Sequence, residues 1–110
     1  MFSTGLSKAQ IERLAILIEE LGEAQQAVGK ILRHGYDSYN PLLEPDADGN
    51  PVTCNRDDLE KELGDVRYAI GLLSAAGDIH EAEILRYRDA KHEKARPYLH
   101  HQVTRGPRVT

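Results

Sequence analysis

Cysteine and aromatic residues are scarce in this sequence, which has one Cys, one Phe, five Tyr and no Trp. The lone Cys54 cannot form an intrachain disulfide, so we expect a reducing, cytoplasmic compartment. The first ten residues contain no basic stretch followed by an apolar run, and we therefore expect no secretory signal. No apolar run approaches the roughly 20 residues that cross a bilayer, so no membrane partner is expected.

Basic residues are also in the minority, with 14 Lys and Arg against 18 Asp and Glu and a net charge of −4 at pH 7. A nucleic-acid partner is not expected, because binding to a phosphate backbone usually requires a basic face. The 110 residues suffice for a single domain over 1–110. A chain of this length buries only about two-thirds of its unfolded surface, so an oligomer interface is a natural source of further core.

Apolar residues recur at helical spacing in most of the chain, which predicts an all-α fold. The first predicted helix covers 7–34, where Ser7 and Gln10 have the spacing of a capping box and Gly35 is suited to the turn that ends it. Its apolar stripe is centred on Leu14, Leu21, Val28 and Leu32.

Two further helices are predicted in the second half of the chain. One covers 55–76 and ends at Gly77, and the next follows at once with Asp78 as its capping residue. Because the connection is so short, these two helices are expected to form an antiparallel hairpin. Pro97 should end the third helix, and residues 98–101 would form a short further helix or a strap.

Residues 36–54 differ from the rest of the chain because they contain three prolines and no helical period. Loops of this length are often functional or partly disordered. Asp46, Asp48 and Asn50 have the spacing of a calcium loop. However, Pro51 stands where that motif requires glycine, and its final glutamate is missing, so a polar turn is the better interpretation.

Two short motifs are nearly identical: ELGE at 20–23 and ELGD at 62–65. At about 100° per residue, Glu20 lies on one edge of the apolar stripe of its helix and Glu23 lies further out. Glu62 and Asp65 fall on the same side of the stripe of the second helix. Residues at the edges of two stripes can face each other when helices pack, and space between the carboxylates would be left by the small Ala24, Ala27 and Ala69.

Four clustered carboxylates repel one another unless they are protonated or neutralised. An all-oxygen ligand set suits Mg²⁺ or Mn²⁺, with the remaining positions taken by water and substrate phosphates. Such a site can polarise a phosphorus and generate a hydroxide nucleophile, and Glu19 would hold or deprotonate the attacking water. A single E-x-x-E is usually a solvated helix face, but two copies on matching sides of two stripes favour a metal site.

The two motifs resemble those of the MazG family of all-α nucleoside triphosphate pyrophosphohydrolases, which carry E-E-x-x-E and, after a spacer, E-x-x-D. The stretches 17–35 and 55–66 are also similar, whereas the spacer here is longer than usual and contains the Pro-rich loop. The resemblance implies a helical bundle that works as a homodimer or a dimer of dimers. It also implies hydrolysis of NTPs or dNTPs between the α and β phosphates, which yields the monophosphate and pyrophosphate.

By position, the resemblance implies roles for individual residues. The ligands of Mg²⁺, with Mn²⁺ as a substitute, would be Glu20, Glu23, Glu62 and Asp65. Glu19 would assist the water or a further metal. Lys30, two helical turns or roughly 10 Å past the first motif, would reach a β or γ phosphate, with Arg33 as a further candidate. Lys91 and Lys94 would close the phosphate site, from a neighbouring subunit if required. The competing interpretations are dipole complementation for Arg33 and a solvated face for the two lysines.

Two other functions fit the same pattern. A carboxylate-bridged di-iron bundle would need E-x-x-H motifs on facing helices, and the nearest match is the late segment 89–92, DAKH. A non-catalytic helical interaction module would leave the acidic edge solvated.

Overall fold

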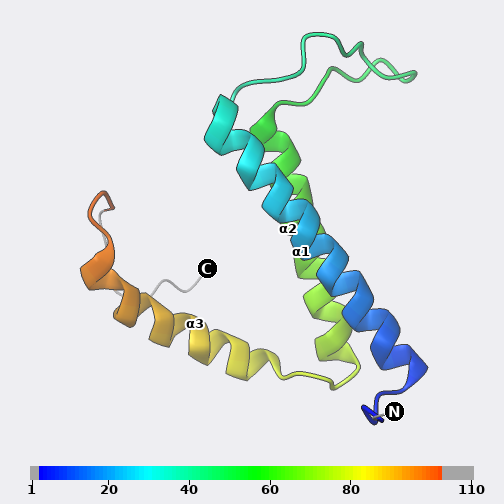
Figure 1. Cartoon of the computed structure of the whole chain (residues 1–110), viewed down its shortest axis with the longest axis vertical. Coiled ribbons are helices and arrows are strands. Elements are labelled where there is room, and N and C mark those ends of the chain that lie inside the picture. Colours follow the sequence, from blue (N-terminus) through cyan, green and yellow to red (C-terminus); the bar gives the residue numbers. More distant parts are fainter. Residues whose placement is uncertain (1–2, 103–110) are drawn as a thin grey trace.

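The computed structural model describes residues 3–102, in which all regular structure is helical (Figure 1). Helix α1 spans Lys8–His34, α2 spans Asn55–Ala75, α3 spans Glu81–Ala95, and a 3₁₀ turn, η1, spans Arg96–Tyr98. The predicted all-α class is therefore confirmed. Over 3–102, no helix is both long enough and apolar enough to cross a membrane.

The ends of α1 and α2 form where local sequence favours them. The Ser7 hydroxyl accepts from the Gln10 amide at 3.0 Å, and the Gln10 side chain accepts from the Ser7 amide at 2.8 Å, as the capping-box spacing predicts. Gly35 ends α1 with φ of 87°, a conformation that glycine adopts without strain. Cys54 precedes α2, and its amide donates to the Asp57 carboxylate at 3.1 Å. That bond lowers the pKa of Asp57.

Helix α2 returns along α1, and the pair is tied at both ends (Figure 1). At one end, the Asn55 amide donates to the Ser38 carbonyl at 2.9 Å. At the other end, Arg13 near the start of α1 donates to both carboxylate oxygens of Asp78, at 2.7 and 3.1 Å. The Arg13 guanidinium lowers the pKa of Asp78. These two contacts set the position of α2 along the length of α1.

Helix α3 does not fold back on α2, so the predicted hairpin of the second and third helices is not formed within the chain (Figure 1). Asp78, expected to cap α3, is instead held by Arg13. The chain turns at Ala76 and Gly77, bends at Asp78 and Ile79, and is extended at His80, with φ −121° and ψ 121°, before α3 begins at Glu81. Helix α3 is therefore splayed from the α1–α2 pair (Figure 1). After α3, η1 takes the place of the predicted helix or strap.

The seam between α1 and α2 is lined by small residues. Its buried apolar residues are Ala24, Ala27, Ala69 and Leu73. On α1 this seam lies roughly a quarter-turn from the centre of the apolar stripe. The large residues at the centre of the stripe stay exposed, namely Leu14, Leu21, Val28 and Leu32. The side of α1 that carries Glu20 therefore faces α2, and the leucine stripe is not the core of this chain.

The dimensions of the chain agree with this uncovered apolar stripe. The radius of gyration is 18.1 Å, against about 13 Å for a compact domain of this length. The accessible surface is 9261 Å², against about 6100 Å² for a compact monomer of this mass. Apolar side chains that a compact protein would bury contribute to this excess, including Ile18 at 72% and Leu32 at 83% exposure.

The segment between α1 and α2 contains a closed polar turn. The Asp46 carboxylate accepts from the amides of Asp48 at 2.9 Å and Asn50 at 2.8 Å, and from the Asn50 side chain at 2.9 Å. These bonds lower the pKa of Asp46. The Asp46 carboxylate thus accepts hydrogen bonds from residues of its own turn, as expected for a polar turn.

Candidate metal centre

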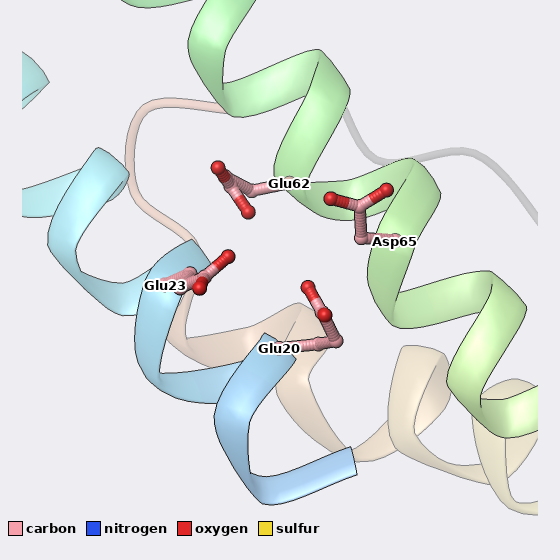
Figure 2. A group of neighbouring side chains, drawn as sticks. All are labelled: Glu20, Glu23, Glu62 and Asp65. Carbon is pink, nitrogen blue, oxygen red and sulfur yellow. The ribbon is translucent and has the colours of Figure 1, made fainter. Parts of the chain in front are cut away.

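The two acidic motifs meet across the α1–α2 seam. Figure 2 shows two carboxylates from α1 and two from α2 that point into one space between the helices. One oxygen from each of the four lies within 4.8 Å of every other, and the group comprises Glu20, Glu23, Glu62 and Asp65. The i, i+3 spacing in each motif stacks its two carboxylates on one face, and the buried alanines bring the helices close enough for the faces to meet.

Burial and the nearness of the carboxylates raise the pKa values of two members of this acidic cluster. The pKa of Glu20 is raised, first by loss of solvation and then by the negative charges of Asp65, Glu19 and Glu62. The pKa of Glu62 is also raised, first by loss of solvation and then by a hydrogen bond with Glu23. Both shifts mean that the folded chain resists placing four full negative charges here without a counter-ion.

Two oxygens of the cluster have no hydrogen-bond partner. They are Oε2 of Glu20 and Oε2 of Glu62, and both are shielded from solvent. A buried carboxylate oxygen without a donor is costly, so each requires a proton or a cation. The ligand set consists entirely of hard carboxylate oxygens, which fits Mg²⁺ or Mn²⁺.

Lys61 is a member of this site that the sequence analysis did not identify. Its ammonium lies 3.0 Å from Asp65 Oδ2 and 3.6 Å from Glu62 Oε1. The bond to Asp65 and the surrounding carboxylates raise the pKa of Lys61. The i, i+4 spacing of Lys61 and Asp65 was a visible signal for the pair. Lys61 thus partly neutralises the cluster, in competition with a metal ion.

We expect Lys61→Met to strengthen Mg²⁺ binding, because the ion then no longer competes with an ammonium for Asp65. Since Lys61 is 69% exposed, the gain should be only about two- to fivefold in Kd, measured by calorimetry. The matched control is Lys8→Met, which removes the same charge about 18 Å along α1 from Glu20 and should leave Kd unchanged. Weaker binding by Lys61→Met than by wild type would contradict this role.

The raised carboxyl pKa values predict how the metal-free protein responds to pH. A carboxyl with a higher pKa in the folded protein binds more protons when folded, so its stabilising effect is lost as pH rises through that pKa. In EDTA, we therefore expect the melting temperature to fall as pH rises above about 4.5, the ordinary value for Glu20 and Glu62. The carboxyls with lowered pKa values act separately, below about 3.8, and include Asp46, Asp57 and Asp78.

Thermal melts of wild type and of a Glu20→Gln, Glu62→Gln double variant between pH 4 and 8 test this expectation. The difference between the two proteins removes the contributions of histidines and other shared groups. The wild type should lose stability relative to the double variant as pH rises, and saturating Mg²⁺ should restore it. If the melting temperatures of the two proteins changed with pH in parallel in EDTA, the raised pKa values of Glu20 and Glu62 would have no effect on stability.

The remaining predicted site residues lie at different distances from the acidic cluster. Glu19 is exposed on α1 and lies outside the four-carboxylate group, although its charge acts on Glu20. Lys30 lines a cavity of about 320 Å³ together with Glu23 and Glu62. Arg33 lines the neighbouring cavity, which Lys30 also borders. Lys91 and Lys94 lie on α3, apart from the α1–α2 pair, so the chain alone does not bring them to the cluster (Figure 1).

Comparison of the chain with protein-family models, curated proteins and solved structures found no match. The functional assignment therefore depends on the chemistry of the site.

Proposed function

We propose that this protein is a Mg²⁺-dependent nucleoside triphosphate pyrophosphohydrolase, as the resemblance of its motifs to the MazG family implies. The observation that carries the proposal is the meeting of four carboxylates from two matched motifs within 4.8 Å. Acidic residues on a solvated helix face would have no reason to converge across a seam, with two oxygens buried and unpartnered.

The four carboxylates would hold the metal between α1 and α2. When bound, Mg²⁺ supplies Lewis-acid polarisation of the α phosphate and lowers the pKa of water. Metal binding would also offset the loss of solvation and the repulsion that together raise the pKa values of Glu20 and Glu62. Because the ligands come from both helices, the ion would join α1 to α2 and stabilise the folded state.

In this proposal, Glu19 would act on the water. Its side chain is exposed beside Glu20, so it can orient the water and accept its proton. The water oxygen bonds to the α phosphorus, and the bond from that phosphorus to the oxygen bridging to the β phosphorus breaks. The electron pair of the broken bond leaves with pyrophosphate. Lys30, beside Glu23 and Glu62, would stabilise the departing anion, with Arg33 next to it.

We also propose that the working form is a homodimer or a dimer of dimers. Each chain exposes about 3000 Å² more surface than a compact monomer of its mass, and the excess of two chains is more than enough for an obligate interface of about 2000–5000 Å² counted over both partners. The leucine stripe of α1 and the separated α3 would both be covered by a second copy. In such an assembly, Lys91 and Lys94 of one chain would be able to approach the acidic cluster of another.

Incubation with each NTP and dNTP plus Mg²⁺, with the products resolved by chromatography, tests the proposed activity. We expect a nucleoside monophosphate and pyrophosphate in equal amounts from at least one substrate. No turnover of any nucleotide, or orthophosphate as the sole primary product, would contradict it. A melting temperature indifferent to Mg²⁺ and nucleotide would favour an interaction module, and an iron-dependent absorption band would favour a di-iron protein.

A further inference from the structure

A second cavity lies next to the acidic cluster. It has a volume of about 490 Å³ and is enclosed by the end of α1, the connecting segment and the first turn of α2. Lys30 and Asp58 border both this cavity and the smaller one that contains Glu23 and Glu62. A ligand group that follows directly on a metal-bound phosphate would therefore enter this space. We call it the loop cavity.

The α1 side of the loop cavity is basic. Lys30, Arg33 and His34 lie at i, i+3 and i+4, so they share one face at the end of the helix. Among the described residues, Lys30 and Arg33 have no carboxylate partner within ion-pair distance. Of the other Lys and Arg side chains in residues 3–102, carboxylate partners are found for Arg13, Arg56, Lys61, Arg86, Arg88 and Arg96, and none within this distance for Lys8, Arg67, Lys91 and Lys94. Two uncompensated cations at a cavity wall favour an anionic ligand.

The opposite wall is fixed to α2 and is partly polar, with Ser38, Asn40, Thr53 and Asn55 beside the less polar Tyr39, Pro41 and Leu43. The amides of Asn55 and Arg56 donate to the carbonyls of Ser38 and Tyr36, each at 2.9 Å. The Asn55 side chain also donates to the Gly35 carbonyl at 3.0 Å. These bonds anchor residues 35–38 on the first turn of α2. They also occupy the first amides of that helix, so an anion would have to be bound by side chains.

Asn40 is the residue of this wall best suited to contact a ligand. Its side-chain oxygen accepts from the Leu42 amide at 3.0 Å, which leaves the NH₂ group to donate. By contrast, the Thr53 hydroxyl donates to Asp58 at 2.7 Å. Asp58 is the acidic residue among the described residues that line the loop cavity, and this bond holds its Oδ1 toward Thr53. The two walls together thus present cations from α1 and a neutral donor from the connecting segment.

We propose that the loop cavity binds the pyrophosphate part of the substrate, with residues 38–43 as its outer wall. This assignment depends on the proposed function and gives the unusually long connecting segment a role in holding the β and γ phosphates. The phosphate chain would run from the acidic cluster past Lys30 to Arg33 and Asn40. The protein would then distinguish triphosphates from monophosphates at this wall.

Calorimetric titration of the full-length protein with inorganic pyrophosphate, with and without Mg²⁺, tests the assignment. We expect Arg33→Met and Asn40→Ala each to raise the Kd for pyrophosphate by roughly five- to twentyfold, because each removes a donor to a charged ligand. Asn40→Ala changes no charge, so it reports on the wall itself. The control Lys8→Met removes a positive charge at the far end of α1 and should leave Kd unchanged. Circular dichroism checks that each variant is folded.

The outcomes separate this assignment from the proposed activity. Equal pyrophosphate affinity in wild type, Arg33→Met and Asn40→Ala would overturn it, even if the protein hydrolyses nucleotides. Orthophosphate bound as tightly as pyrophosphate would also overturn it, because the cavity would then recognise a single phosphate. Selective loss of pyrophosphate binding in both variants would support it, even if no nucleotide were hydrolysed and the proposed activity failed.

Discussion

Glu62→Gln is expected to abolish nucleotide hydrolysis while the fold survives. The substitution keeps the shape of the side chain but removes a negative ligand from the centre of the α1–α2 seam, where Glu62 is only 18% exposed. In the proposed mechanism the bound metal stabilises the transition state, so loss of one of its carboxylate ligands should lower kcat/KM by about a thousandfold or more. Steady-state assays at saturating Mg²⁺ measure the effect.

The same variant has a second signature that activity assays do not report. With one charge fewer in the cluster, the metal-free variant should melt at a higher temperature than metal-free wild type, and its gain on addition of Mg²⁺ should be smaller. The matched control is Glu60→Gln, an exposed glutamate on the same helix that lies outside the cluster. Activity near the wild-type level in Glu62→Gln would contradict the ligand assignment.

Ile18→Lys is expected to dissociate the oligomer. Ile18 lies beside the uncovered leucine stripe of α1, away from α2, and is 72% exposed in the isolated chain. A lysine there would place a charge in the proposed subunit interface, which is costly without a partner. Light scattering after size exclusion should give the mass of one chain. The melting temperature should fall by more than about 10 °C, because an obligate dimer has no stable folded monomer.

The control for this substitution is Ala15→Lys. Ala15 is also exposed on α1, but it lies on the polar face of the helix with Lys8, Glu12 and Glu19. It should retain the wild-type mass and melting temperature. An unfolded Ile18→Lys protein would still agree with the proposal, since the interface supplies much of the core. A variant with the wild-type mass and stability would contradict it.

The acidic cluster could be predicted from the sequence because it depends on local geometry. The i, i+3 spacing within each motif and its side of the apolar stripe follow from the helical period alone. Ala24, Ala27 and Ala69, predicted to leave space between the carboxylates, are all buried in the seam between the two helices. The pairing of Lys61 with Asp65 carried an equally local signal at i, i+4, and it was overlooked.

The position of α3 could not be predicted in the same way, because it depends on a tertiary competition. Asp78 has the right spacing to cap the third helix, but Arg13, 65 residues earlier, forms two hydrogen bonds with it. Nothing in the local sequence reveals that competitor. Likewise, the helical periodicity of the α1 sequence identifies an apolar stripe. It does not say whether another part of the same chain or a second copy packs on that stripe. In this chain, α2 packs about a quarter-turn away from the centre of the stripe.

The position of water attack is tested most directly by hydrolysis in H₂¹⁸O, with the products separated and weighed by mass spectrometry. Attack on the α phosphorus beside the four carboxylates places the label in the nucleoside monophosphate and leaves pyrophosphate unlabelled. We predict that result for wild-type protein with Mg²⁺, and no labelled product above background for Glu62→Gln. Label in pyrophosphate or in orthophosphate, or label in the monophosphate that persists in Glu62→Gln, would contradict metal-dependent attack at this site.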